Sequence, residues 1–310
     1  MNNLLRLIGR RLVALPIMAL GVTLLVFGLM SFTDPSIPAR NALGEGASPE
    51  AIEQYMEEQG LNDPLPERYV NYIGGLLHGD LGTYGAARTS VSSRIATALP
   101  VTMQLTFIGL IIGAIVSFVL GVIAALYRDK WPDQLIRVFS IAGIATPSFW
   151  LAVLMILVFS SYMHLLPASG PLPHFTTNPG GYLARMLMPA IALAFPLTGQ
   201  MTRIVRTAMV EELDKDYVRT ARGGGLPEFV VIARNVLRNA LITPVTTLGL
   251  KIGYLMGGAV VIEVIFNLPG MGMAIISGIQ SNYTMLVQGV VLCVAFTFII
   301  INIIVDMLYT

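Results

Sequence analysis

Six long apolar stretches dominate the sequence. A transmembrane helix needs about 20 mostly apolar residues to cross a hydrocarbon core of about 30 Å. The stretches that reach or approach this length are 12–32, 101–126, 138–162, 183–201, 240–266 and 285–309. Pro147 interrupts the third, and the fourth contains Pro189 and Pro196. The pattern predicts an all-α polytopic membrane protein with six transmembrane helices.

The composition agrees with a membrane protein. The 310 residues are 55% hydrophobic and 12% charged, whereas soluble domains carry about 25% charged residues. A net charge of +1 argues against a nucleic-acid-binding protein. Cys293 is the single cysteine, so no disulfide can form within the chain.

The distribution of basic residues predicts the orientation. With a cytoplasmic N-terminus, thirteen of the 19 Lys and Arg residues lie in cytoplasmic segments and five lie outside. Both termini are then cytoplasmic, in a multi-pass protein of the cell (inner or plasma) membrane. The apolar run of the first stretch is too long for a signal peptide, and no A-x-A cleavage site follows it. It is therefore predicted to be a retained transmembrane helix.

The chain divides into three predicted parts. Residues 1–32 form the cytoplasmic N-terminus and the first transmembrane helix, 33–99 an external segment, and 100–310 a core of five transmembrane helices. The external segment is predicted to form a small helical cap between spans one and two. Ser48, Pro49 and Glu50 are typical of a helix start and Gly60 of its end. A second amphipathic helix is predicted over 66–77, with Tyr69, Val70, Ile73, Leu76 and Leu77 on its apolar side.

Motifs for catalysis, nucleotide binding or metal binding are missing from the sequence. None of the three lysines follows glycine or precedes Ser or Thr, as the P-loop requires. His78, His164 and His174 do not have the spacing of metal ligands. The sequence therefore predicts a protein that is not an enzyme, with no catalytic residues, no metal site and no cofactor of its own.

The segment 203–238, predicted to be cytoplasmic, is the most informative part of the chain. It contains the motif Asp216-Tyr217-Val218-Arg219-Thr220-Ala221-Arg222, then Gly225-Leu226 and Leu237-Arg238-Asn239-Ala240-Leu241-Ile242. This order resembles the EAA-type loop in the membrane subunits of the dipeptide/oligopeptide permease family of ABC importers. Residues 60–65, 79–82, 257–266 and 269–272 are similar to further motifs of the family, so the resemblance covers nearly the whole chain.

The resemblance implies a role and a set of partners. The family's subunits translocate short peptides that an external solute-binding protein delivers. They act as a heterodimer with a second homologous permease and two ABC ATPase subunits, which use ATP and Mg. The loop would dock on an ATPase, and the residues that match it are Glu211, Asp214, Asp216, Tyr217, Arg219, Thr220, Ala221, Arg222 and Gly225. Membrane lipid is the remaining expected partner, and no nucleic acid is expected.

Two departures from the family pattern concern the loop and the fifth span. Gly223-Gly224 stands where the family commonly has Ala-Lys, which predicts a docking helix that ends early. Lys251 stands where glutamine is usual. A charge within a span costs about 2.5–3.5 kcal/mol on insertion scales and normally faces protein or water. The candidates for the pathway or its gate are therefore the two charged residues Lys251 and Glu263. Gly257 and Gly258, which begin the matched segment 257–266, are further candidates.

Alternatives remain open. An autonomous secondary carrier would use Lys251 and Glu263 to couple transport to ions. A membrane-embedded enzyme would need a cluster of catalytic side chains, which the sequence does not show. Within the importer family, the solute could instead be nickel, glutathione or another small molecule, because selection lies largely in the binding protein.

Overall fold

The computed structural model describes residues 2–32, 34–44, 46–58 and 60–308, without the side chains of 2–15, 306 and 308. Most of these residues are helical. The chain divides into two compact units. Unit 1 contains residues 1–102 and 269–308, and unit 2 contains residues 103–268.

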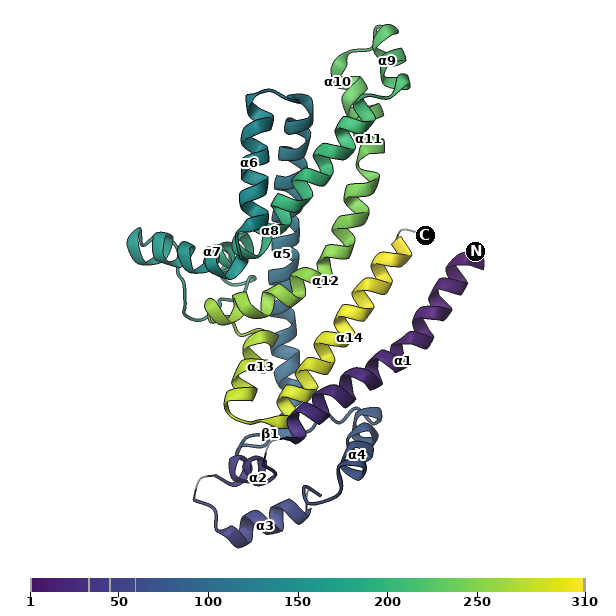
Figure 1. Cartoon of the computed structure of the whole chain (residues 1–310). Coiled ribbons are helices and arrows are strands. Elements are labelled where there is room, and N and C mark those ends of the chain that lie inside the picture. The colour runs from purple at the N-terminus through teal and green to yellow at the C-terminus, as the bar shows by residue number, and fades with distance from the viewer. Residues whose placement is uncertain (1, 33, 45, 59, 309–310) are drawn as a thin grey trace. The chain divides into compact units, whose positions relative to one another are not determined.

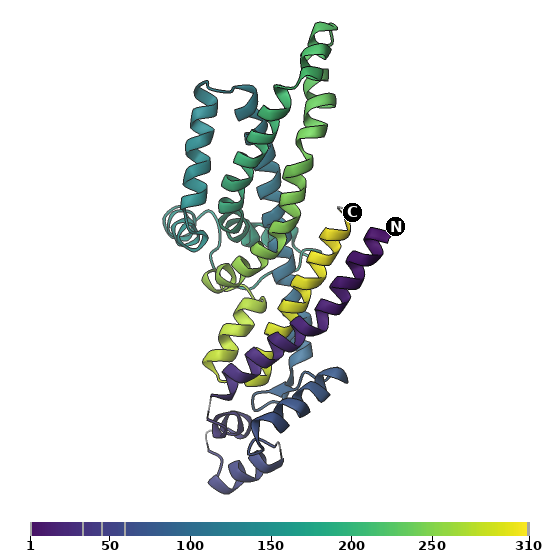
Figure 2. The same cartoon turned by 45° about the vertical axis from the view of Figure 1, so that its right-hand side comes forward.

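Two long helices, α1 (Asn2–Ser31) and α14 (Thr284–Leu308), lie side by side in unit 1, as Figures 1 and 2 both show. The shorter elements of this unit are α2 (Ser36–Leu43), α3 (Pro49–Glu58), α4 (Leu65–Leu77), the antiparallel strands β1 (Thr83–Tyr84) and β2 (Thr89–Ser90), and α13 (Met271–Gln280). Helix α5 (Val91–Leu126) starts here, and its Val91 and Ile95 pack against Met271 of α13 and Val290 of α14. The backbone N–H of Met271 donates to Thr102 Oγ1 at 2.9 Å.

The two helices predicted in the external segment are present as α3 and α4. The Ala51 N–H donates to Ser48 Oγ at 3.2 Å, which confirms the predicted start of α3. Helix α4 begins one residue earlier than predicted. Its predicted apolar side is only partly right, because Val70 and Leu77 are exposed.

Helix α4 packs on α1 through aromatic residues. The Tyr69 ring lies edge-on to Phe27, with 5.3 Å between centroids, and the Tyr72 ring stacks on the same side chain at 6.0 Å. The Tyr69 hydroxyl also lies 2.9 Å from Thr23 Oγ1. The packed side of α4 is therefore its tyrosine side, and the aliphatic residues on the remaining surface are left open.

Helix α8 (Pro179–Leu213) is the centre of unit 2 and carries its largest set of buried residues. Around it pack α6 (Trp131–Ala145), α7 (Ser148–Met155) and α12 (Ile242–Ile265). Helices α6 and α8 touch at glycines: a Cβ on Gly199 would lie 2.6 Å from the Ser140 carbonyl oxygen and 3.1 Å from the Gly143 Cα. The Ser140 hydroxyl donates to the Gly199 carbonyl. A larger residue at Gly199 would separate the two backbones.

By length and composition, four helices of the described residues can cross a membrane: α5, α8, α12 and α14. Counting each of two bent pairs as one span raises the number to six. One bent pair joins part of α1 to α2, and the other joins α6 to α7 with the π-helix η1 (Ile156–Tyr162). The fold is therefore that of a polytopic helical membrane protein with four to six candidate spans.

The third predicted span differs most from the structure. Instead of one interrupted helix over 138–162, the chain bends by 101° between α6 and α7. Thr146 is extended, with ψ 117°, and Pro147 follows at ψ 136°. Proline lacks an N–H and disfavours helical backbone in the residue before it, so the bend falls here.

Other differences concern helix length. Helix α5 starts ten residues before the predicted 101–126, and α8 extends beyond 183–201 at both ends. The sequence did not predict α2, α13 or the small hairpin. Hydropathy marks only the apolar part of a helix, and the polar turns that continue it are invisible to that measure.

Candidate functional site

The predicted docking segment, 203–238, begins as the end of α8 and continues through four short helical elements. These are α9 (Asp216–Gly223), α10 (Glu228–Val230), the π-helix η2 (Val231–Val236) and α11 (Leu237–Ala240). Figure 1 shows α9 and α10 beyond the end of α8. The segment therefore projects from one end of unit 2.

Helix α9 has a well-defined start and end. It follows Lys215, whose backbone is extended, and Asp216 places a carboxylate in the first turn, where the helix dipole favours negative charge. Gly225 has φ +76°, the left-handed conformation that glycine adopts most readily, and the Leu226 N–H donates to the Ala221 carbonyl at 3.3 Å. Gly225 thus forms the turn that follows α9. A Cβ there would meet no atom within 4 Å.

One side of α9 is fixed to the rest of unit 2 by apolar packing. Val218 is buried in a cluster with Val205 and Met209 of α8 and Val231 and Val236 of η2. Burial of such side chains from water holds a short helix that could not persist alone. The side of α9 that carries Val218 is therefore anchored.

Tyr217 adds a polar tie between α9 and its neighbours. Its hydroxyl donates to Glu212 Oε1 at 2.6 Å and accepts from Asn239 Nδ2 at 3.3 Å. Partial burial, followed by the bond to Glu212, raises the pKa of Tyr217 above its ordinary value of 10. The hydroxyl therefore stays protonated at neutral pH and keeps donating to Glu212.

The other side of α9 is open and carries most of the predicted docking residues. Ala221 is half-buried, and the exposed ones are Glu211, Asp214, Asp216, Tyr217, Arg219, Thr220, Arg222 and Gly225. Arg219 Nη1 lies 3.4 Å from Asp216 Oδ1. We call the exposed residues from Asp214 to Phe229 the α9 surface.

An ion pair joins α9 to α10 across this surface. Arg222 Nε and Nη2 donate to Glu228 Oε2 and Oε1 at 3.1 and 2.6 Å. The hydrogen bond from Arg222 lowers the pKa of Glu228 below its ordinary value of 4.5. These two hydrogen bonds fix the position of α10 relative to α9.

The α9 surface also contains apolar residues that the sequence reading missed. Phe229 is 80% exposed and Leu226 is 46% exposed. Large apolar side chains beside charged ones are common where proteins bind each other. An aromatic residue next to Pro-Glu in a polar segment was the signal available in the sequence.

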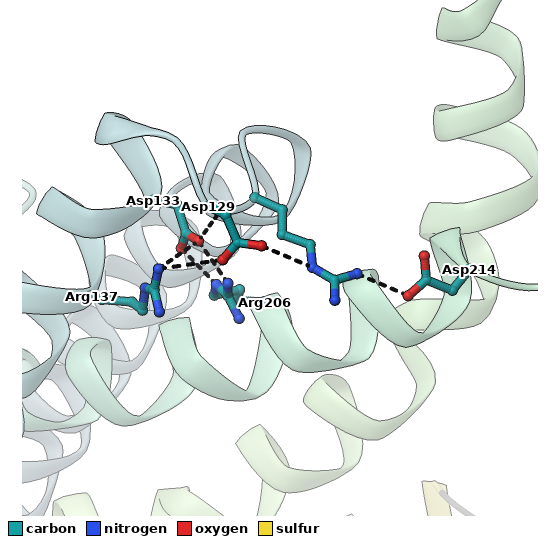
Figure 3. A network of polar contacts seen from close by, with 6 residues as sticks. Asp129, Asp133, Arg137, Arg206 and Asp214 are labelled. Atoms are coloured by element: carbon teal, nitrogen blue, oxygen red, sulfur yellow. Dashed lines mark hydrogen bonds and ion pairs between the residues drawn. The ribbon is translucent and has the colours of Figure 1, made fainter.

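A buried carboxylate lies at the start of α6. The Asp133 side chain is 0% exposed, and it accepts from Arg206 Nε and Nη2 of α8 at 2.6 and 2.7 Å. It also accepts from the Asp129 backbone N–H at 2.9 Å, and Arg137 Nη2 lies 3.2 Å away. Figure 3 shows Arg137 and Arg206 directed at this carboxylate. Asp133 therefore has several partners for its two oxygens.

The network continues from Asp133 toward α9. Arg128 Nη1 lies 2.9 Å from Asp214 Oδ2, in the turn that precedes α9, and its Nε lies 3.6 Å from Asp129 Oδ2. Arg137 also approaches Asp129, at 3.7 Å. We call these six residues the Asp133 cluster: Arg128, Asp129, Asp133, Arg137, Arg206 and Asp214. The cluster links the α5–α6 turn to the end of α8 (Figure 3).

Only Asp214 of this cluster was a predicted site residue. The three arginines were used only to predict the orientation in the membrane, and Asp129 and Asp133 were not used at all. Trp131-Pro132-Asp133 has the proline and first-turn acid of a helix start, which was the available signal. Its pairing with Arg206, 73 residues later, is a tertiary contact that no local pattern contains.

The four candidate pathway residues are distributed along α12. Lys251 is half-buried, and its Nζ lies 5.8 Å from the centroid of the Tyr254 ring. Gly257 is exposed, Gly258 faces Leu193 of α8, and Glu263 is buried. Lys251 and Glu263 are twelve positions apart, about 18 Å along a helix. The structure thus does not bring these two charges together.

Arg185 is a second charge inside unit 2. From the sequence it was only one of the five basic residues placed outside the membrane. Arg185 of α8 is buried, and it donates to the carbonyls of Ala168 at 2.7 Å and Phe266 at 2.7 Å. Further bonds reach the Gly170 and Asn267 carbonyls. The planar guanidinium has five donors, which suits such a ring of carbonyls. Arg185 fixes the end of α12 and the loop before α8 to one point.

Two family models match the sequence. Residues 117–310 match the binding-protein-dependent transport system inner membrane component, and residues 4–106 match the N-terminal part of such membrane components. The first model alone covers more than half of the chain.

Relatives align over almost the whole length. A protein of Brucella suis biovar 1 (strain 1330), named as a peptide transport system permease, is 39% identical over 96% of this chain and 94% of its own. A protein of Escherichia coli (strain K12), named as a D,D-dipeptide transport system permease, is 34% identical over 98% and 95%. The glutathione transport system permease protein of Pectobacterium atrosepticum is 34% identical over 97% and 95%.

A solved structure supports the fold. The crystal structure of an amino acid ABC transporter with histidines matches with a TM-score of 0.53 at 13% identity, over 70% of this chain and 94% of that one. At this identity the likeness concerns the fold alone. The family models and the relatives show that this chain belongs to the inner membrane components of binding-protein-dependent transport systems.

Proposed function

We propose that this chain is a permease subunit of an ATP-driven importer for short peptides. The observation that carries the proposal is the α9 surface, where charged groups and Phe229 stand exposed on a short helix. The buried contacts of Val218 anchor that helix, and the Arg128–Asp214 pair ties the turn before it to the α5–α6 turn. The names of the relatives, which refer to peptide, D,D-dipeptide and glutathione, support the class of solute.

The proposed arrangement has six crossings with both termini in the cytoplasm. The crossings are α1, α5, the bent pair of α6 and α7, α8, α12 and α14, while residues 33–99 form the external helical cap and residues 203–238 are cytoplasmic. The parts proposed are 1–32, 33–99 and a core of 100–310. The excess of Lys and Arg in the segments placed inside supports this orientation.

The proposed complex contains a second homologous permease, two ABC ATPases and an external solute-binding protein, within membrane lipid. ATP and Mg bind to the ATPases. This chain has no P-loop motif, and no group of three His, Cys, Asp or Glu residues in its described part could hold a metal ion. Closure of the ATPases would draw the α9 surfaces together and open the pathway outward, and hydrolysis would reset it.

Cysteine labelling tests the orientation. In a Cys293→Ser background, Glu53→Cys and Asp214→Cys each introduce one thiol at an exposed position. An impermeant thiol reagent added to intact cells should modify the first and spare the second. Reversed labelling would refute both the orientation and the docking role of α9.

Reconstitution tests the transport role. The purified subunit should hydrolyse no ATP above background, whereas the complete complex in vesicles should import dipeptides with ATP and binding protein present. Uptake that needs only an ion gradient would instead indicate the secondary carrier. Competition between dipeptides, glutathione and nickel for the same uptake decides among the solutes of this family.

A further inference from the structure

Lys251 is a cation in the middle of an apolar helix. It lies about 14 Å from the start of α12 and about 21 Å from its end, at 1.5 Å per residue. α12 is one of the four helices that can cross a membrane by length and composition. A lysine at such a depth is costly in lipid unless it faces protein or water.

Among the described residues, no carboxylate pairs with this ammonium group. Its one recorded contact in the described part of the chain is the face of the Tyr254 ring, at 5.8 Å from the centroid. Arg185, a cation with a structural role in the same unit, is buried and donates to several carbonyl oxygens. Lys251, in contrast, is only half-buried, and the neighbouring Tyr254 is 63% exposed.

The surroundings of Lys251 on α12 are also unlike a lipid-facing surface alone. Thr247 lies one helical turn before it, and Gly258 lies two turns after it. Leu255 and Ala259, which flank this row of residues on one side, are buried. Leu250 and Val261, which flank it on the other side, are exposed. Lys251 therefore lies in a row with Thr247, Tyr254 and Gly258, at the border between the buried and the exposed sides of α12.

We propose that Lys251, oriented by Tyr254, binds the carboxylate of the molecule in transit and so favours anionic over cationic cargo. The inference rests on the proposed function, because the cargo it names is a short peptide. Peptides, D,D-dipeptides and glutathione all carry at least one free carboxylate. The ring face attracts the ammonium and holds it within the span, while its three N–H donors remain free for an oxygen ligand. A fixed positive charge also repels cargo with a cationic side chain.

The test uses three labelled dipeptides of net charge −1, 0 and +1, taken up by the complete complex in vesicles with its binding protein. Each variant is compared with wild type for each peptide, so the preference of the binding protein cancels in the ratio. Lys251→Gln should lower uptake of the anionic peptide relative to the cationic one by roughly fivefold to tenfold. Lys251→Glu should reverse the preference, and Lys251→Arg should retain it. Tyr254→Leu should weaken the preference without reversing it.

ATPase association should be unchanged in these variants, since Lys251 and Tyr254 lie on α12 and not on the α9 surface. Equal loss of uptake for all three peptides, or unchanged ratios, would overturn the proposal. If wild type imports no dipeptide at all, the proposed function fails instead.

A second measurement places Lys251 independently of transport. Lys251→Cys in the Cys293→Ser background should react with a negatively charged thiol reagent in one nucleotide state of the complex. The anionic dipeptide should protect this thiol better than the cationic one. A thiol that is inert with and without nucleotide would place the residue against lipid or a partner subunit and overturn the proposal.

Discussion

The Asp133 cluster and the α9 surface use the same ion-pair chemistry in opposite settings. Asp133 is fully buried and binds an Arg206 side chain that is only 20% exposed. The pairs Arg219–Asp216 and Arg222–Glu228 are largely exposed. Removing one partner of a buried pair leaves a charge without compensation, whereas exposed pairs contribute little to stability.

The buried pair therefore contributes to the stability of the fold, whereas the exposed pairs are suited to binding a partner. The buried pair fixes α6 to α8, and its groups have little access to another protein. The exposed pairs leave the fold almost indifferent to substitution and keep charged atoms available to a partner. If the comparison holds, variants of the two regions should affect different measurements.

The largest effect is expected from Asp133→Ala. It leaves Arg206 unpaired in a site that is mostly closed to water and should destabilise the fold by about 3 kcal/mol. The midpoint of thermal unfolding in detergent should fall by at least about 6 °C. The matched control is Asp216→Ala, an exposed carboxylate that also pairs with arginine and should shift the midpoint by about 1 °C at most. Equal shifts for the two variants would show that the buried and the exposed carboxylate contribute alike to stability.

Gly225→Arg should have the opposite signature. The residue lies outside every candidate span and has open space around it, so insertion and heterodimer formation should persist. Co-purification of the ATPase and transport-coupled hydrolysis should be lost, because the bulky residue strains the turn and stands on the docking side.

Gly79→Arg is the control for the strain itself. Gly79 has φ +80° and also has no atom near its Cβ position, but it belongs to unit 1. This variant should keep ATPase association. If Gly225→Arg co-purifies the ATPase at wild-type level and imports peptide normally, the α9 surface is a solvated connector.

Phe229→Ala sharpens the role of the apolar part of the α9 surface. Truncation of a central aromatic contact typically weakens binding by about 2 kcal/mol, or roughly thirtyfold. Titration of purified ATPase onto the reconstituted permease measures the affinity. Leu77→Ala, which also truncates a highly exposed apolar side chain, should leave that affinity unchanged. An unaltered affinity in Phe229→Ala would restrict docking to the charged residues.

The smallest effect concerns Glu228. Its pKa is lowered in the folded state, so its pairing stabilises above the ordinary value of 4.5 and is lost as pH falls through the lowered pKa. Glu228→Gln should cost about 0.5 kcal/mol at pH 7 and nothing at pH values below the lowered pKa. Thermal unfolding of both proteins across this range checks it. A difference that grows on acidification would have the wrong sign for this pair.

Local patterns predicted the elements well and the tertiary contacts poorly. The cap at Ser48 follows from residue chemistry within a few positions, and it is present. Long apolar runs revealed α5, α8, α12 and α14 because burial in lipid depends on composition. The 101° bend at Pro147 was marked as an interruption, but its size depends on how α6 and α7 pack against α8.

Residues that act through distant partners were the ones missed. Arg185 and Arg206 both lie on α8, and their partners come from other elements of the chain. Phe229 was missed although an aromatic residue in a polar segment was a signal, because its exposure depends on how α10 packs. The docking roles of the α9 residues and the pathway role of Lys251 stay predictions until the experiments above are done.

The two arginines of α8 have a mechanical consequence. The helix runs without a break for 35 residues, or about 52 Å. Arg185 binds the start of α8 to the loop before this helix and to the end of α12. Arg206, about 32 Å further along α8, binds Asp133 of α6. A rod held near one end behaves as a lever, so a tilt of about 10° around Arg185 would carry the other end of α8, about 42 Å away, through roughly 7 Å. A push received at α9 would thus be converted into rotation around a fulcrum that lies near the opposite end of the same helix.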